Sequence, residues 1–159
     1  MSHPKKIFLI LVLSCSLSFL DASVPTPQSY YAPMIEQYQE KNWKKMANSA
    51  EKLIRDFPQS AFGKEAFYYL GIAYFNLGKY DLANDTFAAY LKEEANPKFF
   101  DEVIRYKFEI ACRFQAGYKR HLFGSSAMPR WMSANEEAIA IYDEVITAFP
   151  RDDLAAESL

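Results

Sequence analysis

The sequence predicts an all-α protein made of consecutive helical hairpins, and three observations support this. Apolar residues recur at spacings of three and four through most of the chain, which is typical of amphipathic helices. No stretch alternates apolar and polar residues over the length of a strand. Half of the 159 residues are hydrophobic, including 13 phenylalanines and 11 tyrosines. This composition is sufficient for the core of one domain.

Residues 65–91 contain the most complete hairpin. The apolar face of its first helix consists of Ala66, Tyr69, Leu70, Ala73, Tyr74 and Leu77. Gly78 then supplies a residue that readily adopts the left-handed conformation at a helix C-terminus. The apolar face of the second helix consists of Tyr80, Ala83, Phe87, Tyr90 and Leu91. The two faces predict antiparallel helices joined by a short turn.

The order of small and large residues in this hairpin resembles that of the tetratricopeptide repeat. The matching positions are Leu70, Gly71, Tyr74, Gly78, Tyr80, Ala83 and Phe87. Gly71 and Ala83 allow two helices to approach closely because neither carries a large side chain, and aromatic residues then fill the adjoining space. The resemblance implies a tetratricopeptide-like helical hairpin solenoid with about three repeats and the start of a fourth.

Three such units are expected within a repeat domain that covers residues 34–159. The first unit ends at Pro58 and lacks a glycine at the close-packing position of its first helix. The third unit has apolar faces over 103–114 and 138–146, separated by an inserted loop. Residues 152–159 resemble the start of a helix with nothing following to pack against, which suggests a fragment.

Residues 1–22 are expected to be a signal peptide for export. Lys5 and Lys6 precede the apolar run 7–13, which is the order of charge and hydrophobicity in such leaders. The run is too short to cross a bilayer as a permanent helix.

The end of the leader allows two forms of processing. Residues 12–15, Val-Leu-Ser-Cys, look like a bacterial lipobox, in which Cys15 would be lipidated and anchored to a membrane. Ordinary cleavage after Ala22 or Ser23 would instead remove Cys15. Residues 23–33 carry three prolines and are expected to form an extended tether.

The order of leader, tether, weak first repeat, strong second repeat and interrupted third repeat resembles the outer membrane assembly lipoproteins of the BamD, or competence lipoprotein, family. The residues that carry the likeness are Phe57-Pro58-Gln59-Ser60, Leu70-Gly71-Ile72-Ala73-Tyr74, Tyr80-Asp81-Leu82-Ala83 and His121-Leu122-Phe123-Gly124. The family's fourth and fifth repeats have no counterpart. The resemblance implies a non-enzymatic adaptor at the periplasmic face of the outer membrane, whose partners are proteins of the barrel-assembly machinery or unfolded outer membrane proteins.

The exposed side of each first helix is expected to line a concave partner-binding groove. In the second unit the groove positions are Glu65, Tyr68, Ile72, Phe75 and Asn76. Tyr68 and Phe75 are aromatic residues away from the main packing face, as anchors for a peptide would be. The alternative is that both rings pack against the neighbouring repeat.

The inserted loop, at about 117–133, mixes positive charge with aromatic residues. Its candidate interface residues are Lys119, Arg120, Phe123, Arg130 and Trp131. Such a composition suits membrane headgroups or an acidic partner. The alternative is that the apolar side chains of the loop fold back onto the third hairpin and leave only the basic groups in water.

No catalytic, metal or cofactor site is expected. His121 is the only histidine outside the leader, and no nucleophile has a base at a recognisable spacing. Cys112 and His121 have no second Cys-His pair to complete a metal site, and Cys112 is expected to be a small buried hydrophobe. The net charge of −2 becomes more negative once the leader is removed, which disfavours nucleic acid as a partner.

Two other functions remain open from the sequence. One is a periplasmic repeat protein that coordinates cell division or peptidoglycan synthesis, related to CpoB, for which cleavage after Ala22 would leave a chain without an anchor. The other is the repeat scaffold of a longer cell-wall enzyme, such as a lytic transglycosylase, with its catalytic domain beyond Leu159.

Overall fold

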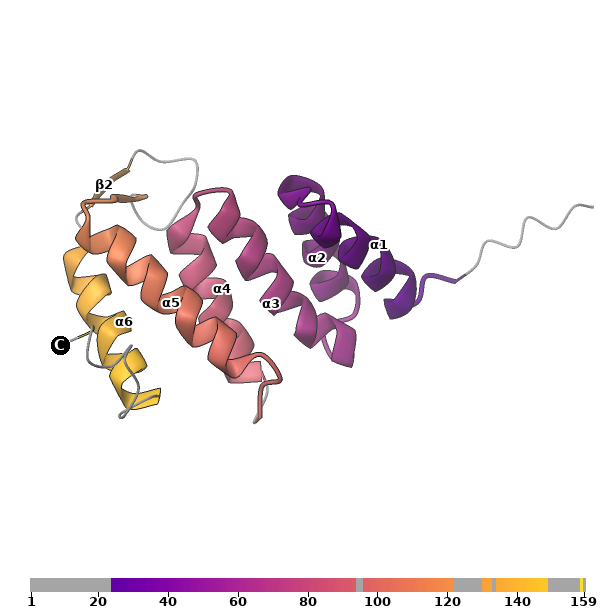
Figure 1. The fold of residues 1–159 in the computed structure, drawn as a ribbon. Helices are drawn as coiled ribbons and strands as arrows, with labels where there is room; N and C mark the ends of the chain where they lie inside the picture. The colour runs from indigo at the N-terminus through magenta and orange to yellow at the C-terminus, as the bar shows by residue number, and fades with distance from the viewer. Residues whose placement is uncertain (1–23, 94–95, 122–129, 133, 149–157, 159) are drawn as a thin grey trace, which may run out of the picture.

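The computed structural model describes residues 24–93, 96–121, 130–132, 134–148 and 158, and within them the fold is a row of helical hairpins (Figure 1). The helices are α1 (Pro27–Gln39), α2 (Trp43–Asp56), α3 (Ala61–Asn76), α4 (Tyr80–Glu93), α5 (Phe100–Gln115) and α6 (Asn135–Ala148). Two short antiparallel strands, β1 (Arg120–His121) and β2 (Arg130–Met132), lie between α5 and α6. The expected all-α, tetratricopeptide-like hairpin solenoid is confirmed, with three hairpins described.

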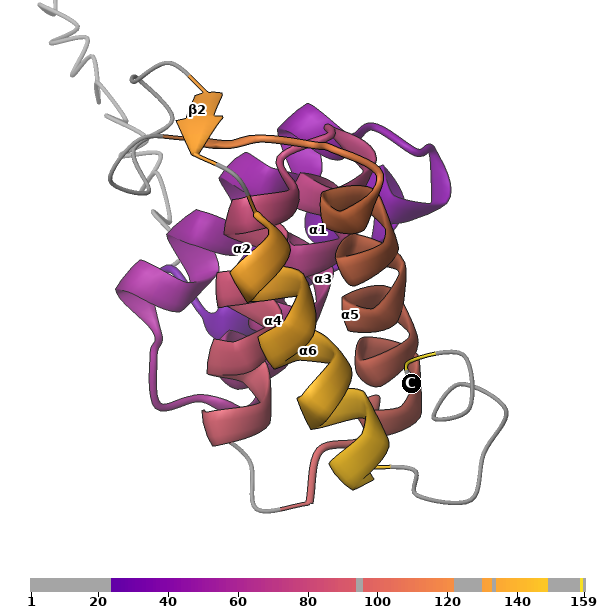
Figure 2. The same ribbon diagram turned by 90° about the vertical axis from the view of Figure 1, so that its left-hand side faces the viewer.

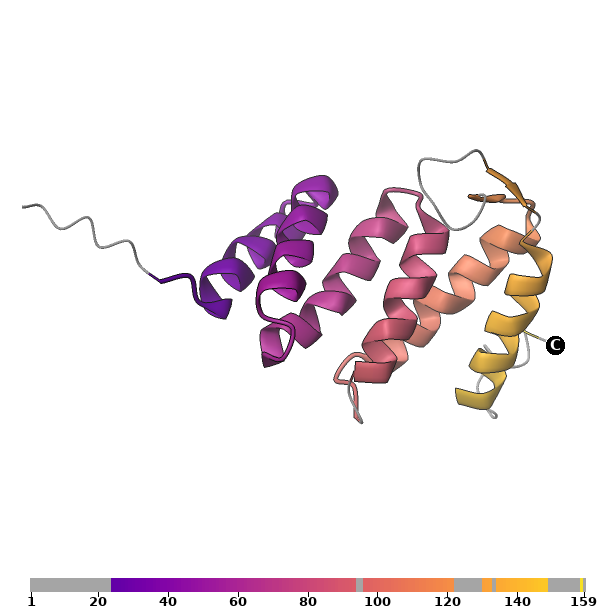
Figure 3. The ribbon, with the colours of Figure 1, turned by 180° about the vertical axis from the view of Figure 1, so that it is seen from behind.

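The helices form two layers. The first helices of the hairpins, α1, α3 and α5, lie on the side that Figure 1 presents, and the second helices, α2, α4 and α6, lie on the side seen in Figure 3. The end-on view in Figure 2 shows α5 and α6 as a pair in front of the earlier helices. The turns within the three hairpins all lie at one end of the molecule (Figures 1 and 3).

The three turns share one hydrogen-bonding pattern. In the second hairpin, the N–H of Gly78 donates to the carbonyl of Phe75, and the N–H of Lys79 donates to the carbonyl of Tyr74. Equivalent bonds form around Lys41 and Gly117, and all three residues have positive φ, at 56°, 68° and 93° in chain order. This is a Schellman-type helix ending, and it confirms the role predicted for Gly78.

Close packing within the second hairpin depends on Gly71. A Cβ atom at this position would lie 2.4 Å from Cε1 of Phe87, whose side chain is fully buried. Ala83, the other small residue of the pattern, is also fully buried. The predicted opposition of small and large residues is therefore confirmed here.

The N-terminal tether expected over 23–33 is wrong from Pro27 onward, where α1 begins. Thr26 and Ser29 form a reciprocal capping box. The N–H of Ser29 donates to the hydroxyl of Thr26 at 3.3 Å, and the N–H of Thr26 donates to the hydroxyl of Ser29 at 3.2 Å. Pro27 stands at the first helical position, where a missing N–H costs nothing. Pro33 lies within α1 and is exposed. The expected signal peptide and fourth-repeat start lie outside the described residues.

A polar network crosses the buried space between α4, α5 and α6. Lys107 of α5 is fully buried, and its ammonium contacts Oδ1 of Asn84 at 2.9 Å and Oε2 of Glu144 at 2.8 Å. The side-chain amide of Asn84 also donates to Oε1 of Glu137 at 3.0 Å. Three helices are therefore joined by hydrogen bonds around one buried cation.

Candidate protein-binding face

The side formed by α1, α3 and α5, termed here the first-helix face, carries a continuous series of aromatic rings. We define the aromatic row as Tyr38, Tyr69, Tyr68 and Phe99. The ring centroids of Tyr38 and Tyr69 are 5.4 Å apart, and those of Tyr69 and Tyr68 are 5.2 Å apart. Tyr68 then stacks on Phe99 at 4.0 Å with an interplanar angle of 12°. The row thus joins α1 to α3 and α3 to the residue that precedes α5.

A second group of rings joins α3 to α5 nearer the turns. Phe75 meets Tyr106 of α5 at 5.1 Å and Tyr80 of α4 at 5.4 Å, both edge to face. Tyr106 also stacks on Phe87 at 5.3 Å. Aromatic contacts therefore hold neighbouring hairpins together at two levels along the first-helix face.

Tyrosine hydroxyls and acidic groups influence one another on this face. Burial raises the pKa of Tyr68, and the nearby Tyr106, Tyr38 and Glu102 raise it further. Burial likewise raises the pKa of Tyr106, followed by the effects of Tyr38 and Glu109. The side chains concerned come from both α1 and α5, so the face brings together polar groups that are far apart in the sequence.

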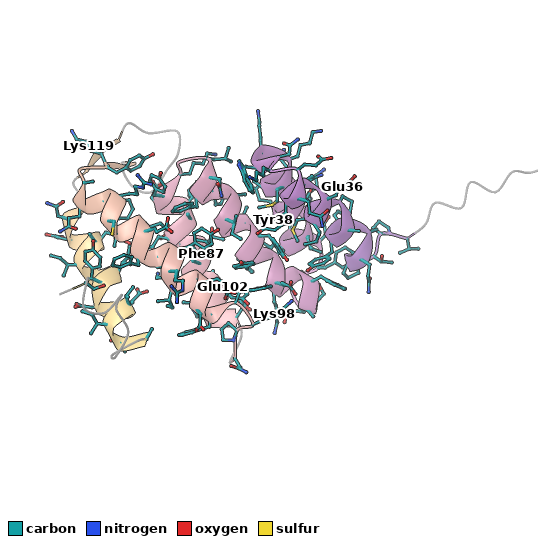
Figure 4. The ribbon with its side chains drawn as sticks, viewed as in Figure 1. Glu36, Tyr38, Phe87, Lys98, Glu102 and Lys119 are labelled. Atoms are coloured by element: carbon teal, nitrogen blue, oxygen red, sulfur yellow. The ribbon has the colours of Figure 1, made fainter. Side chains whose placement is uncertain are left out.

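Two hollows open at the start of α5, close to the end of the aromatic row. The larger, of about 540 Å³, is lined by Asn96, Pro97, Lys98, Phe100, Asp101 and Glu102. The smaller, of about 150 Å³, is lined by Ala61, Glu65, Tyr90, Asn96 and Lys98. Figure 4 shows Lys98 and Glu102 in this region and Tyr38 and Glu36 on α1. Exposed charges thus lie near both ends of the row, where Tyr38 itself is 37% exposed.

Two of the predicted groove residues prove to be core residues. Tyr68 is 8% exposed and Ile72 1% exposed, so neither offers a free side chain to a partner. The aromatic contact of Tyr68 with Phe99 corresponds to the alternative interpretation, packing against the neighbouring repeat. Phe75 is half-buried and makes the same kind of contact with Tyr106.

The two polar groove residues lie at opposite ends of α3. Glu65 is half-buried, accepts a hydrogen bond of 2.7 Å from the hydroxyl of Tyr31, and lies 3.6 Å from the ammonium of Lys98. Asn76 is exposed, and its side-chain amide donates to the carbonyl of Ile72 in its own helix. Glu65 therefore borders the smaller hollow, whereas Asn76 lies next to the turn.

The inserted loop begins with a contact that the sequence analysis missed. The ring of Tyr118 meets that of Tyr80 at 4.6 Å, and its hydroxyl donates to the carbonyl of Gly78. The loop is thus attached to the turn of the second hairpin. Among its predicted interface residues, Lys119 is exposed, Arg120 lies in β1, Arg130 and Trp131 lie in β2, and Phe123 lies outside the described residues.

Tyr38 and Tyr106 were not among the predicted groove residues. Tyr38 could have been found from the turns, since it precedes Lys41 by the same three residues that separate Phe75 from Gly78. Tyr106 gave no comparable signal, because its importance depends on contacts with Phe75 and Phe87 from another hairpin.

The described residues contain no group of three histidine, cysteine or acidic side chains that could hold a metal ion. No helix in the same part of the chain has the length and apolar composition needed to cross a membrane. Cys112 is half-buried, and the hydroxyl of Tyr142 lies 3.5 Å from its sulfur.

The comparison with protein families decides what kind of repeat this is. Residues 65–96, which include most of α3 and all of α4, match the model of the tetratricopeptide repeat. The chain contains a tetratricopeptide repeat. No curated protein matches the chain. Tetratricopeptide repeats generally mediate contacts between proteins, so the hairpin stack is that of a protein-binding scaffold.

Proposed function

We propose that this protein is a non-catalytic adaptor of the bacterial envelope, similar to the BamD component of the outer membrane β-barrel assembly machinery. It binds an extended segment of an outer membrane protein or of an assembly partner along the first-helix face. It acts at the periplasmic side of the outer membrane, where lipidation of Cys15 provides its anchor.

The single observation that supports this mode of binding is the aromatic row, which is accessible to a partner at both of its ends. Tyr38 remains accessible at α1, and the two hollows lie beside Glu65 and Lys98 at the other end. An accessible tyrosine supplies a large contact area and a hydroxyl donor at little entropic cost, as anchors of protein interfaces do. The rings between these ends are buried and fix the spacing of the helices.

The location in the envelope is supported by the sequence alone. Residues 7–13 form the apolar run of an export leader, and Cys15 ends the lipobox-like tetrad. The family resemblance described above, from Phe57-Pro58 to Tyr80-Asp81, supports the assembly machinery as the particular partner.

Site-specific photo-cross-linking in the source cells tests this proposal. A photo-reactive phenylalanine analogue at Tyr38 is expected to capture a barrel-assembly component or an unfolded outer membrane protein, identified by mass spectrometry. Asn48 is the matched control, because it is an exposed position on α2, in the opposite layer. Equal yields at Tyr38 and Asn48 would contradict the first-helix face as the binding surface. Capture at Tyr38 of cell-division or cell-wall proteins alone would replace the proposal with the CpoB-like function.

A further inference from the structure

The end of the solenoid that holds the hairpin turns carries lysines in all three hairpins. We define the lysine edge as Lys41, Lys44, Lys45, Lys79 and Lys119. Lys41 belongs to the turn between α1 and α2, Lys79 to the turn between α3 and α4, and Lys119 to the connection after α5. All are exposed except Lys79, which is half-buried. The turns lie at the same end in Figures 1 and 3, and Lys119 is labelled there in Figure 4.

From this edge we propose that the protein docks on a membrane surface that contains anionic lipid headgroups. The proposal concerns a different surface from the first-helix face and does not depend on the partner bound there.

Lys41 occupies a position that favours glycine. Its φ of 56° lies in the left-handed region, and the equivalent residues of the other two turns are Gly78 and Gly117. A side chain in this conformation is disfavoured by contact between Cβ and the backbone. The first hairpin therefore carries a cation at a place where the local conformation opposes any side chain.

Lys44 and Lys45 oppose the electrostatics of their helix. They stand in the first turn of α2, where the positive end of the helix dipole disfavours cations. The first turn of α2 contains no acidic residue, whereas α4, α5 and α6 each have at least one there. Like Lys41, these two lysines are placed where they do not favour folding.

Among the described residues no lysine of the edge forms an ion pair, and the exposed Glu40 beside Lys41 contributes one negative charge to the same turn. The ion pairs of that part of the chain involve Arg55, Lys98 and Lys107, and none includes a lysine of the edge. Lys79 lies over the ring of Tyr74 at 5.6 Å. Lys44 and Lys45 neither pair with carboxylates nor favour their helix, and they are the members best suited to an external anion. Lys41, Lys79 and Lys119 follow the C-termini of α1, α3 and α5, where the helix dipole favours a cation, and they extend the positive charge along the same end of the molecule.

The chemistry of the edge favours lipid headgroups over the carboxylates of an acidic protein. The lysines that define the edge are compact point charges on flexible stems, whereas Arg120, which follows Lys119 in β1, adds a further positive charge to the connection after α5. Lysines near an anionic membrane each contribute to attraction without a fixed geometry.

Vesicle co-sedimentation of the full chain tests the proposal. Vesicles of phosphatidylcholine mixed with phosphatidylglycerol are compared with vesicles of phosphatidylcholine alone, so that binding through apolar insertion is subtracted. The charge of Lys5 and Lys6 in the leader is common to the wild-type chain and to both variants, so it cancels when the variants are compared. The test variant combines Lys44→Gln, Lys45→Gln and Lys119→Gln. The matched control combines Lys52→Gln, Lys64→Gln and Lys92→Gln, which removes the same charge from residues outside the edge.

The wild-type chain is expected to bind the anionic vesicles more tightly than the neutral ones. The edge variant should weaken that preference about a hundredfold, whereas the control variant should change it less than about threefold. Equal losses in both variants, or no preference in the wild-type chain, would overturn the proposal. Wild-type binding to soluble polyglutamate without binding to anionic vesicles would also overturn it and assign the edge to an acidic protein.

Discussion

The second and third hairpins have the same architecture but different interior chemistry. Counted back from the positive-φ residue of each turn, Gly78 or Gly117, the seventh residue is Gly71 in the second hairpin and Ile110 in the third. The tenth residue is Tyr68 in the second hairpin and Lys107 in the third. Gly71 packs on Phe87, and Tyr68 stacks on Phe99. Lys107 instead holds α4 and α6 by hydrogen bonds.

The difference shows that one backbone arrangement accepts two solutions to helix packing. A glycine opposite an aromatic ring brings helices together by close apolar contact. A buried ammonium does so only when its donors find acceptors, since an unpaired buried charge is costly. The match to the repeat family covers 65–96, where the first solution is used, and does not extend over the hairpin that uses the second.

The largest expected effect comes from removing the ring that fills the second hairpin. Phe87→Ala should lower the free energy of unfolding by about 3–5 kcal/mol, because Phe87 is fully buried. Urea denaturation followed by circular dichroism measures this change.

The first hairpin suggests a compensating substitution for Phe87→Ala. Counted from the positive-φ turn residue, Met34 corresponds to Gly71 and Ala50 corresponds to Phe87. The first hairpin therefore has the large side chain on its first helix and the small one on its second, the reverse of the second hairpin. Gly71→Met alone should cost about 1–3 kcal/mol by overpacking. Combined with Phe87→Ala it should show a favourable interaction energy of about 1–3 kcal/mol. Strictly additive losses would show that the two positions are not complementary.

The third hairpin should respond to the loss of its hydrogen bonds. Lys107→Met should lower the free energy of unfolding by about 1–3 kcal/mol, because Oδ1 of the buried Asn84 loses its donor. Adding Asn84→Leu should recover part of this loss, since the buried pair becomes apolar while Oε1 of the half-buried Glu137 loses the Asn84 donor.

Chemical denaturation of both Lys107 variants tests the comparison between hairpins. Arg105→Met is the control, because Arg105 is exposed on the same helix and should change stability by less than about 0.5 kcal/mol. A double variant less stable than Lys107→Met would show that the third hairpin needs its polar network.

The turns allow the hairpins to be compared at a single position. Gly78→Ala should cost about 1 kcal/mol because φ is 68° there, and Lys41→Gly should stabilise the chain by about the same amount. Thermal denaturation of the two variants measures these opposite signs. Loss of stability in Lys41→Gly would contradict the view that the lysine is retained against the local conformation.

The residues predictable from the sequence are those whose role depends on their own hairpin. The spacing of Gly71 and Phe87 predicted the close packing of the two helices, because it follows from helical periodicity. Gly78 predicted the turn, because backbone sterics favour glycine at positive φ. The start of α1 was missed because prolines outweighed the capping box formed by Thr26 and Ser29.

The candidate site was less predictable because it is assembled between hairpins. Periodicity places Tyr68 away from the main packing face of α3, but only the position of Phe99 decides that it is covered. Tyr118 likewise contacts Tyr80 across a separation that no local pattern encodes. Such contacts depend on how successive hairpins stack, which the sequence of one repeat does not specify.

The smallest expected effect concerns a tyrosine within the third hairpin. Burial raises the pKa of Tyr142 from 10.0 to about 12, followed by the hydrogen bond to Cys112. The hydroxyl is closer to Oε1 of Gln115, at 2.9 Å, and donates its single hydrogen there, which holds α6 against α5. Because the folded chain favours the protonated phenol, the stabilisation from Tyr142 is complete below about pH 10 and is lost as the pH rises to about 12.

Tyr142→Phe should therefore reduce the fall in unfolding free energy between about pH 10 and pH 12. The measurement is urea denaturation of both chains across this range, with the wild-type curve as reference because the pKa values of Tyr68 and Tyr106 are also raised. At alkaline pH below about 10, the difference in stability between the two chains should not vary with pH. Parallel curves up to about pH 12 would show that the third hairpin does not depend on the protonated phenol, and would leave Lys107 as its principal polar contact.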